Sequence, residues 1–185
     1  MVKKNACIFI SGAGTNLKAL IRSSREYNYP INVKLIFSST KSAKGLIFAK
    51  LYKIPYYILN LNNQLNITLG LKKLKENDIS LICLAGYMNI LKKQFINKYK
   101  NKIINIHPSL LPRYKGLDTF KRVLKAKEKV TGCTVHYVNS KIDSGKIILK
   151  KKVYIEEYDT EISLKAKVQQ AEYKTYSKAI INIFR

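Results

Sequence analysis

The residues best suited to catalysis follow a short apolar run in the middle of the chain. Asn105 and His107 lie two residues apart, directly after Ile104. On a β-strand they would point to the same face, so that their polar tips could reach one substrate atom. A carboxamide can donate a hydrogen bond to a developing oxyanion, and a histidinium can donate a second one and pass on a proton. The spacing therefore predicts a site that stabilises a tetrahedral oxyanion.

The surroundings of this pair support the same interpretation. Pro108 biases His107 toward extended geometry, and Pro112 does the same to Leu111, so the segment is stiff where the polar groups leave the strand. A carboxylate beside the imidazole would raise its pKa and favour the protonated form, and Asp143 is our candidate for that carboxylate. The alternative is a proline-rich surface loop with an incidental histidine.

A second candidate site follows the first apolar run of the chain. Gly12 and Gly14 lack Cβ atoms where the backbone must turn sharply, and a helix that begins next would present free N–H groups and the positive end of its dipole. A phosphate fits such a turn. The segment has neither the GxGxxG pattern nor a Walker lysine, which disfavours a dinucleotide or a nucleoside triphosphate. The alternative is a simple chain reversal.

The order of apolar and amphipathic segments indicates the fold class. Apolar runs alternate with amphipathic segments through the first half, which is typical of an α/β fold with a mostly parallel twisted sheet and helices on both faces. Because ligands bind beyond the carboxyl ends of such strands, residues 12–14, 86–88 and 105–107 should converge there. We expect strands at residues 6–10, 31–37, 56–59, 79–84 and 103–106, and helices at 16–25, 43–52, 65–76 and 92–99.

The second half of the chain has a different pattern. A helix at 118–126 precedes two strands, at 131–138 and 146–153, which we expect to form an antiparallel C-terminal extension with Asp143 in the connecting loop. A final helix is expected at 160–183. Its apolar face is predicted to consist of Ile162, Ala166, Tyr173, Tyr176, Ile180 and Ile183.

Length and composition indicate a small globular protein. A chain of 185 residues suits a single domain, 1–185, without a linker or an internal repeat. The first apolar run is too short for a membrane span and lacks a signal-peptide pattern, so we expect a cytoplasmic protein with no membrane partner. The three cysteines are far apart and each lies among apolar residues, which favours buried thiols. Neither histidine has ligand spacing to a cysteine, so we expect no metal.

The net charge of +24 raises the question of a polyanionic partner. The lysines are spread along the whole chain, asparagine and isoleucine are also abundant, and no basic tail stands out. An AT-rich coding sequence would produce the same composition. We therefore expect no nucleic-acid partner, although a positive field would attract an anionic substrate.

The octapeptide Asn-Ile-His-Pro-Ser-Leu-Leu-Pro at 105–112, with Tyr114, Gly116 and Asp143-x-Gly145 after it, is the most specific of several segments that point to one enzyme family. Together they resemble the folate-dependent phosphoribosylglycinamide formyltransferases of purine synthesis. Residues 10–17 resemble the opening loop of the family, 84–88 its folate-side segment, and 168–172 a patch of its last helix. The similar segments thus extend from near the first strand to the final helix.

The resemblance implies a Rossmann-like formyltransferase fold and a specific reaction. A formyl group would pass from 10-formyltetrahydrofolate, the cosubstrate, to the amine of glycinamide ribonucleotide, in a protein that is a monomer or a homodimer. The catalytic residues would be Asn105, His107 and Asp143. The other implied contacts are Gly14, Thr15 and Asn16 to the substrate phosphate, Met88, Asn89, Ile90, Leu91 and Asn105 to the folate, and Gln169 and Glu172 near the amine substrate.

Some features of the chain differ from the family pattern, and other functions share its chemistry. Asn89 stands where the family commonly has an arginine, and residues 117–119 lack its common histidine. The other histidine, His136, alternates with Val135 and Tyr137 in an expected strand, and we interpret it as structural. The alternatives are a methionyl-tRNA formyltransferase-like activity, a formyltetrahydrofolate deformylase-like activity, and a basic nucleic-acid-binding module without catalysis.

Overall fold

The structure is a computed structural model that describes residues 2–99 and 101–185. The chain divides into two compact units, one ending at Ile104 and the other running from Asn105 to Arg185. The prediction of a single domain over residues 1–185 remains a prediction. No helix in the described residues is both long enough and apolar enough to span a membrane.

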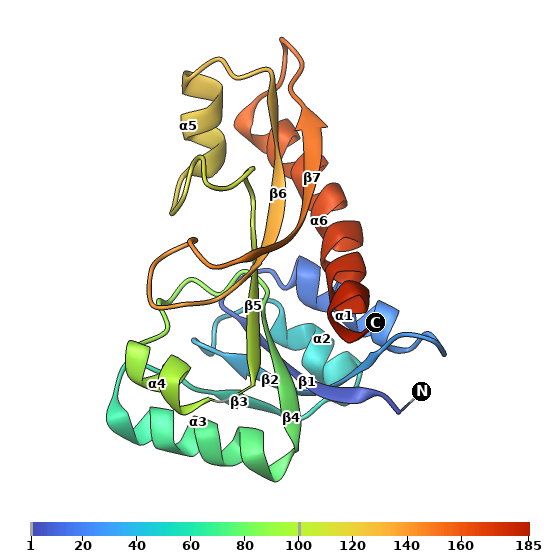
Figure 1. Cartoon of the computed structure of the whole chain (residues 1–185), viewed down its shortest axis with the longest axis vertical. Helices are drawn as coiled ribbons and strands as arrows, with labels where there is room; N and C mark the ends of the chain where they lie inside the picture. Colours follow the sequence, from blue (N-terminus) through green and yellow to red (C-terminus); the bar gives the residue numbers. More distant parts are fainter. Residues whose placement is uncertain (1, 100) are drawn as a thin grey trace. The chain divides into compact units, whose positions relative to one another are not determined.

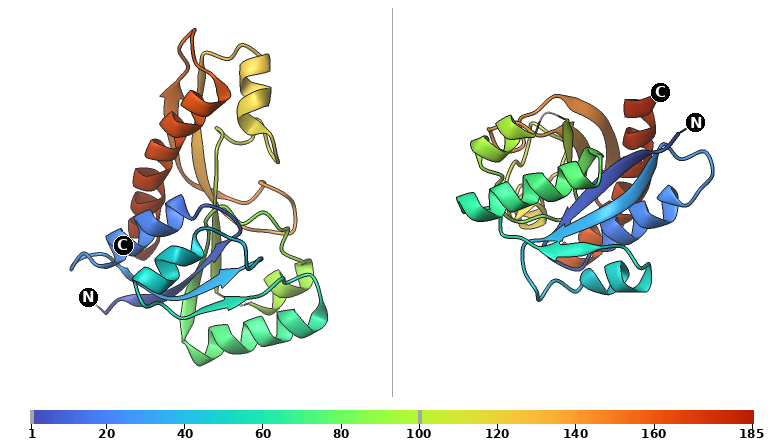
Figure 2. Two further views of the ribbon diagram at one scale, coloured as in Figure 1. Left: turned by 180° about the vertical axis from the view of Figure 1, so that it is seen from behind. Right: turned by 90° about the horizontal axis from the view of Figure 1, so that it is seen from below.

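The first unit is an α/β layer structure with a parallel sheet. Its strand order is β3-β2-β1-β4, and the pairs β1–β2, β1–β4 and β2–β3 are all parallel. The views in Figures 1 and 2 show α1 and α2 on one face of these strands and α3 on the other. The elements are β1 (Lys4–Ile10), α1 (Thr15–Ser24), β2 (Ile31–Ser38), α2 (Leu46–Leu51), β3 (Tyr56–Ile58), α3 (Gln64–Glu76), β4 (Ile79–Leu84) and α4 (Lys93–Lys98).

The apolar runs become the central strands because both of their faces are covered. Cys7, Ile8, Phe9 and Ile10 in β1 are fully buried, as are Leu81, Ile82 and Cys83 in β4. Strands covered on both faces consist of continuous apolar residues, whereas half-exposed strands alternate. The rings of Phe9 and Phe37 lie 5.1 Å apart and extend this core across the neighbouring strands.

Ser11 connects the segments that follow β1, β2 and β4. Its backbone N–H donates to the Gly86 carbonyl at 3.1 Å, and its Oγ accepts a hydrogen bond from the Met88 N–H at 2.9 Å. The same Oγ lies 2.6 Å from Ser39 Oγ, beyond the end of β2. The opening loop and the 86–88 segment therefore meet at the carboxyl ends of the strands, as predicted. Convergence of residues 105–107 with them remains a prediction.

The second unit contains the antiparallel extension. The strand β5 (Lys102–His107) begins in the first unit and ends in the second, where the order is β5-β6-β7. The strands β6 (Val130–Tyr137) and β7 (Ile147–Tyr154) are antiparallel, which confirms the prediction. Between β5 and β6 lies α5 (Thr119–Lys125), and α6 (Glu161–Phe184) packs against β6, β7 and α5.

The buried face of α6 differs in part from the predicted one. Tyr176 and Ile180 are fully buried as expected, but Ile162 is 83% exposed and Leu164 is buried in its place. Ala166, also predicted on the buried face, is exposed as well. The helix begins with a capping box in which the Thr160 side chain accepts from the Ser163 N–H, so Ile162 lies in an exposed first turn. The buried face then follows Leu164 and Val168.

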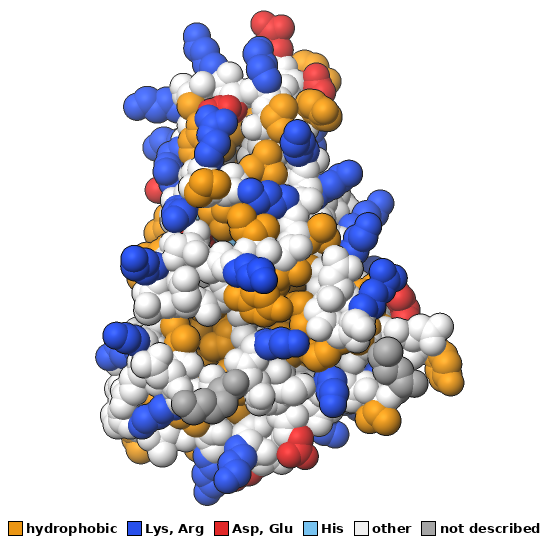
Figure 3. All heavy atoms as spheres, in the orientation of Figure 1, with side chains coloured by type: hydrophobic (Ala, Val, Ile, Leu, Met, Phe, Trp, Pro, Cys, Tyr) orange, Lys and Arg blue, Asp and Glu red, His pale blue; other side chains and the backbone are white. Residues whose placement is uncertain are grey.

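The face drawn in Figure 3 shows lysine and arginine side chains scattered over the surface, without a continuous basic stripe on that face. This distribution matches the even spacing of lysines along the sequence. A polyanion-binding surface usually gathers its positive charges along one groove or helix. The dispersed charge on this face therefore agrees with the compositional explanation.

Two glycines from different loops determine the shape of the opening loop. Gly14 has φ +72°, and a Cβ built on it would lie 2.5 Å from Gly45 Cα. A Cβ on Gly45 would in turn lie 2.8 Å from Gly14 Cα. The Gly45 N–H also donates to the Gly12 carbonyl at 2.9 Å. Both backbones need the absence of a side chain for this approach.

Replacing Gly14 with alanine should destabilise the protein. The positive φ and the overpacking against Gly45 should together lower the free energy of unfolding by about 2–5 kcal/mol. Gly12→Ala is the matched control, because a Cβ at Gly12 meets nothing within 4 Å, and it should change stability by about 0.5 kcal/mol or less. Urea unfolding measures both variants, and equal losses would contradict the assigned role of the Gly14–Gly45 contact.

Candidate active site

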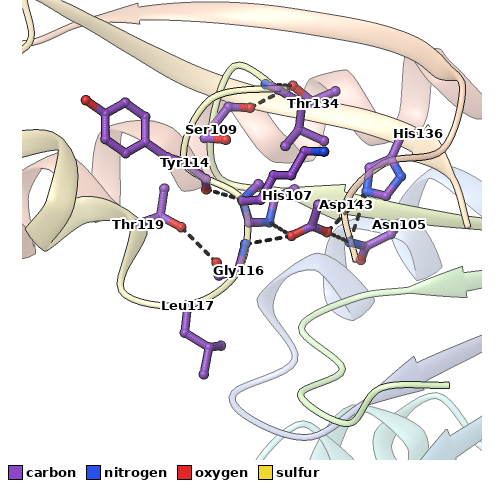
Figure 4. A network of polar contacts seen from close by, with 12 residues as sticks. Asn105, His107, Ser109, Tyr114, Gly116, Leu117, Thr119, Thr134, His136 and Asp143 are labelled. Carbon is purple, nitrogen blue, oxygen red and sulfur yellow. Dashed lines mark hydrogen bonds and ion pairs between the residues drawn. The ribbon is translucent and has the colours of Figure 1, made fainter. Parts of the chain in front are cut away.

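The predicted catalytic residues come together within the second unit. Asn105 and His107 alternate with the buried Ile106 in β5, so their side chains share one face of the strand. Asp143 lies in the loop between β6 and β7 with φ +45°. Figure 4 shows all three side chains converging, with the carboxylate between the two others. The grouping of Asn105, His107 and Asp143 in space is confirmed.

The Asp143 carboxylate accepts hydrogen bonds from several chain segments. Its Oδ2 lies 2.9 Å from the Gly116 amide nitrogen and 3.2 Å from His107 Nδ1. Its Oδ1 lies 3.4 Å from Asn105 Nδ2 and 3.5 Å from His136 Nε2. The Asp143 side chain is only 10% exposed. Although burial raises the pKa of Asp143, its contacts with His136, the Gly116 amide and His107 outweigh this effect, so the pKa is lowered.

His107 faces a hydrogen-bond acceptor at each ring nitrogen. Nε2 lies 2.8 Å from the Tyr114 carbonyl oxygen, and Nδ1 faces Asp143. Since a carbonyl can only accept, the hydrogen of the neutral ring belongs on Nε2, and the Nδ1 lone pair then points at the carboxylate. If Nδ1 takes up a proton, the new N–H can donate a hydrogen bond to Asp143. The ring is therefore placed to receive a proton during a reaction.

The predicted direction of the His107 pKa is wrong. Burial of the ring lowers the pKa below its ordinary value of 6.5, and this effect exceeds the opposing contributions of the Tyr114 carbonyl and Asp143. His136 and Arg122 lower it further. Asp143 does act in the predicted direction, but how deeply the ring is buried depends on tertiary packing, which no sequence pattern reports. The free protein thus favours neutral His107 at neutral pH.

His136 belongs to the same cluster, although the sequence suggested a structural residue. Its Nδ1 faces the Tyr137 carbonyl oxygen at 2.8 Å, which places a hydrogen there and leaves Nε2 able to accept. Nε2 lies 3.3 Å from Asn105 Nδ2. The only available sequence signal was the position of His136 on a strand that could pair with β5. That signal does not distinguish a site residue from a buried structural one.

The residues predicted to bind ligands lie on several elements. Thr15 and Asn16 begin α1 directly after Gly14, and Met88, Asn89, Ile90 and Leu91 follow β4. The Asn89 carboxamide donates to the Asn60 Oδ1 at 3.2 Å, so it has a partner where the family commonly has an arginine. Gln169 and Glu172 are three residues apart on α6 and share one of its faces, and Glu172 is buried. Their roles in binding remain predictions.

The described parts of the chain contain no group of three or more His, Cys, Asp or Glu side chains arranged to hold a metal ion. The Asp143 cluster instead combines one carboxylate with two amide donors and two imidazole rings. Such a donor set suits proton transfer and oxyanion stabilisation. The prediction that the reaction needs no metal remains a prediction.

Comparison with known proteins identifies the family. The formyl transferase family model matches residues 4–180. The phosphoribosylglycinamide formyltransferase of Haemophilus influenzae is 37% identical over 181 residues, which cover 96% of this chain and 85% of that protein. The chain belongs to the phosphoribosylglycinamide formyltransferase family. The resemblance inferred from the motifs is thereby confirmed.

Two further comparisons support this family and its fold. The crystal structure of the phosphoribosylglycinamide formyltransferase from Anaplasma phagocytophilum is 35% identical with a TM-score of 0.91, over 99% of this chain and 88% of that chain. The predicted formyltransferase fold is thereby confirmed. The trifunctional purine biosynthetic protein adenosine-3 of Homo sapiens is 37% identical over 96% of this chain. The chain spans only 18% of the length of that trifunctional relative.

NMR should resolve the titration of His107 in this family member. We expect His107 to titrate below pH 6.5, because its buried ring resists charge, and Asp143→Asn to lower the midpoint further by removing a contribution that raises it. His136→Gln assigns the signals, and the exposed Glu157→Gln serves as a control that leaves the midpoint unchanged. A wild-type His107 midpoint above 6.5 would show that the carboxylate outweighs burial.

The lowered pKa of His107 also makes the stability of the protein depend on pH. Since the folded-state pKa of His107 lies below the unfolded value, its contribution to the free energy of unfolding is complete above pH 6.5. That contribution is lost as the pH falls from there toward the folded-state pKa. Wild type should therefore lose more stability than His107→Gln between pH 8 and the folded-state midpoint.

Proposed function

We propose that this protein transfers the formyl group of 10-formyltetrahydrofolate to the amine of glycinamide ribonucleotide in purine synthesis. The observation that carries the proposal is the grouping of Asn105 and His107 around the Asp143 carboxylate. Family membership supports it, because the Haemophilus influenzae relative is named for this formyl transfer. Acid–base and oxyanion-stabilising groups are what amine attack on a formyl carbon requires.

The reaction would proceed by direct attack. The amine nitrogen bonds to the formyl carbon, and the carbonyl electron pair moves to oxygen and gives a tetrahedral oxyanion. Neutral His107 accepts the proton that the attacking nitrogen loses. When the intermediate collapses, the bond from carbon to N10 of the folate breaks, and N10 receives the proton that His107 took up, which returns His107 to its neutral form. The products are the formylated ribonucleotide and tetrahydrofolate, so atoms and charges balance.

Asn105 would donate a hydrogen bond to the oxyanion, and protonated His107 would stabilise it by its positive charge. The Asn105 amide hydrogens are held at 3.4 Å from Asp143 and 3.3 Å from His136, which is long for a hydrogen bond. An oxyanion at a normal distance could therefore compete for them. Once His107 is protonated, the ionised Asp143 stabilises the imidazolium through Nδ1. Asp143 thus acts on the proton transfer through His107.

The remaining binding roles follow from the resemblance. We propose that Gly14, Thr15 and Asn16 bind the phosphate at the N-terminal end of α1, a position that favours anions. Residues 88–91 and Asn105 would contact the folate, and Gln169 and Glu172 the amine substrate. Both units would act as one domain, in a cytoplasmic monomer or homodimer without a metal or a nucleic-acid partner.

An acceptor comparison tests the proposal. Purified protein is mixed with a 10-formyl folate and either glycinamide ribonucleotide, initiator methionyl-tRNA or no acceptor, and deformylation is followed by absorbance. Turnover that depends on the ribonucleotide is expected. Turnover with tRNA, or without any acceptor, would replace the proposal with a tRNA formyltransferase-like or deformylase-like activity. Absence of turnover with all three would contradict formyl transfer.

The catalytic residues should affect turnover more than binding. We expect Asn105→Ala and His107→Ala each to lower kcat by roughly 10²–10³, because each removes a group that acts on the oxyanion. Asp143→Asn should also lower kcat, because it removes the charge that stabilises protonated His107. Asn182→Ala, on the exposed surface of α6, is the matched control for Asn105→Ala. Unchanged kcat in a variant would remove that residue from the mechanism.

A further inference from the structure

The loop at residues 113–117 contacts the catalytic cluster through its backbone. The Tyr114 carbonyl accepts the hydrogen of His107 Nε2 at 2.8 Å, and the Gly116 N–H donates to Asp143 Oδ2 at 2.9 Å. One short loop thus contacts two catalytic side chains. A displacement of this backbone by an ångström would weaken both hydrogen bonds.

The loop adopts a conformation that needs support from its surroundings. Tyr114 has φ +55°, a left-handed conformation that is uncommon for a large side chain. Gly116, at φ +78°, accommodates the same region without a Cβ. A residue with a side chain remains in such a conformation only where neighbouring contacts hold it. The contacts of the Tyr114 side chain are therefore the relevant observation.

The Tyr114 side chain is held from several directions. Its hydroxyl donates to Glu128 Oε1 at 2.7 Å, and the same oxygen pairs with Arg113. The guanidinium carbons of Arg113 and Arg122 lie 5.4 and 5.5 Å from the centre of the tyrosine ring, within cation–π range. Figure 4 shows the ring directed away from the cluster while the backbone carbonyl of Tyr114 faces His107.

Arg122 also holds the backbone of the same loop. From α5, its Nη1 donates to the Lys115 carbonyl at 2.6 Å and reaches the Leu117 carbonyl at 3.3 Å. These two carbonyls flank Gly116, whose N–H contacts Asp143. A guanidinium presents several donors in a fixed plane, which a lysine ammonium cannot reproduce. Arg122 therefore fixes the direction in which the Gly116 N–H points.

We propose that Glu128 and Arg122 are positioning residues, which hold Tyr114 and its loop so that the backbone of the loop orients His107 and Asp143 for proton transfer. Neither residue is placed to contact the reacting atoms. Their effect on the reaction passes through the Tyr114 carbonyl and the Gly116 N–H. This inference rests on the proposed function for its kinetic consequence, whereas its effect on His107 can be measured without any substrate.

The first test uses variants that remove single groups from this support. Tyr114→Phe deletes only the hydroxyl, and Glu128→Ala deletes its acceptor. Each should lower kcat by roughly three- to tenfold, the effect of one hydrogen bond, with KM changed less than about twofold. Glu128→Gln keeps an oxygen that can accept from the hydroxyl and should restore most of kcat. The exposed Glu157→Ala is the matched control.

The second test measures the titration of His107 by NMR in the free protein. The groups that influence it are Asp143, His136 and Arg122 together with the Tyr114 carbonyl, and that carbonyl raises the pKa. Loss of the carbonyl contact in Tyr114→Phe or Glu128→Ala should therefore move the midpoint to lower pH. Arg122→Lys keeps the positive charge but loses the planar donors, so a shift in this variant reports position rather than charge.

Turnover and the His107 titration together distinguish failure of the positioning proposal from failure of the proposed function. Wild-type kcat and an unchanged His107 midpoint in Tyr114→Phe and Glu128→Ala, whatever their thermal stability, would overturn the proposal. A Glu128→Gln variant as slow as Glu128→Ala would overturn the role of the hydroxyl acceptor. If wild type transfers no formyl group while the variants still shift the midpoint, the proposed function fails but the positioning of His107 by this loop is supported.

Discussion

The arrangement of the second unit depends on one buried carboxylate. Asp143 contacts polar groups of β5, of the loop at Gly116 and of β6, and none of these segments is adjacent to it in sequence. A carboxylate with 10% side-chain exposure is costly unless hydrogen bonds replace its water shell. The same contacts that make its burial tolerable also orient Asn105 and His107. The Asp143 carboxylate therefore both joins distant segments of the second unit and orients the catalytic side chains.

His107 illustrates how burial and charge compete at this cluster. The carboxylate beside the ring favours the imidazolium, and removal of water disfavours it, with the second effect larger in the free protein. An oxyanion that formed nearby would add a second negative charge and shift the balance toward the imidazolium. A ring that is neutral at rest and charged in the transition state favours the transition state over the ground state. Such a difference is what accelerates a chemical step.

Much of this fold was predictable because local patterns determine it. The mostly apolar runs at 79–84 and 103–106 became β4 and β5 because strands covered on both faces are rich in apolar residues. The Asn105–His107 spacing predicted a shared face because strand periodicity requires it. Ile162 was placed on the wrong face because helical periodicity leaves open which neighbouring stripe is buried, and packing against β6 and β7 decides that.

The features that sequence patterns missed are those that tertiary contacts create. His136 joins the cluster only because its strand carries it to Asn105, and a histidine between Val135 and Tyr137 looks the same in either role. The net pKa of His107 required its depth of burial, which no local pattern reports. The support of Tyr114 by Glu128 and Arg122 joins residues whose side chains have no shared periodicity.

The hydrogen bonds of Ser11 have a consequence for how the first unit responds to ligands. A single hydroxyl accepts from the Met88 N–H and contacts Ser39, while the backbone of the same residue donates to Gly86. Any ligand that orders the turn after β1 therefore also orders the segment after β4. Thermodynamic linkage makes such coupling reciprocal, so a ligand at one segment would change the affinity for a ligand at the other by the same factor as the reverse. In this unit, cooperativity between two substrates would need no moving domain, only one shared serine.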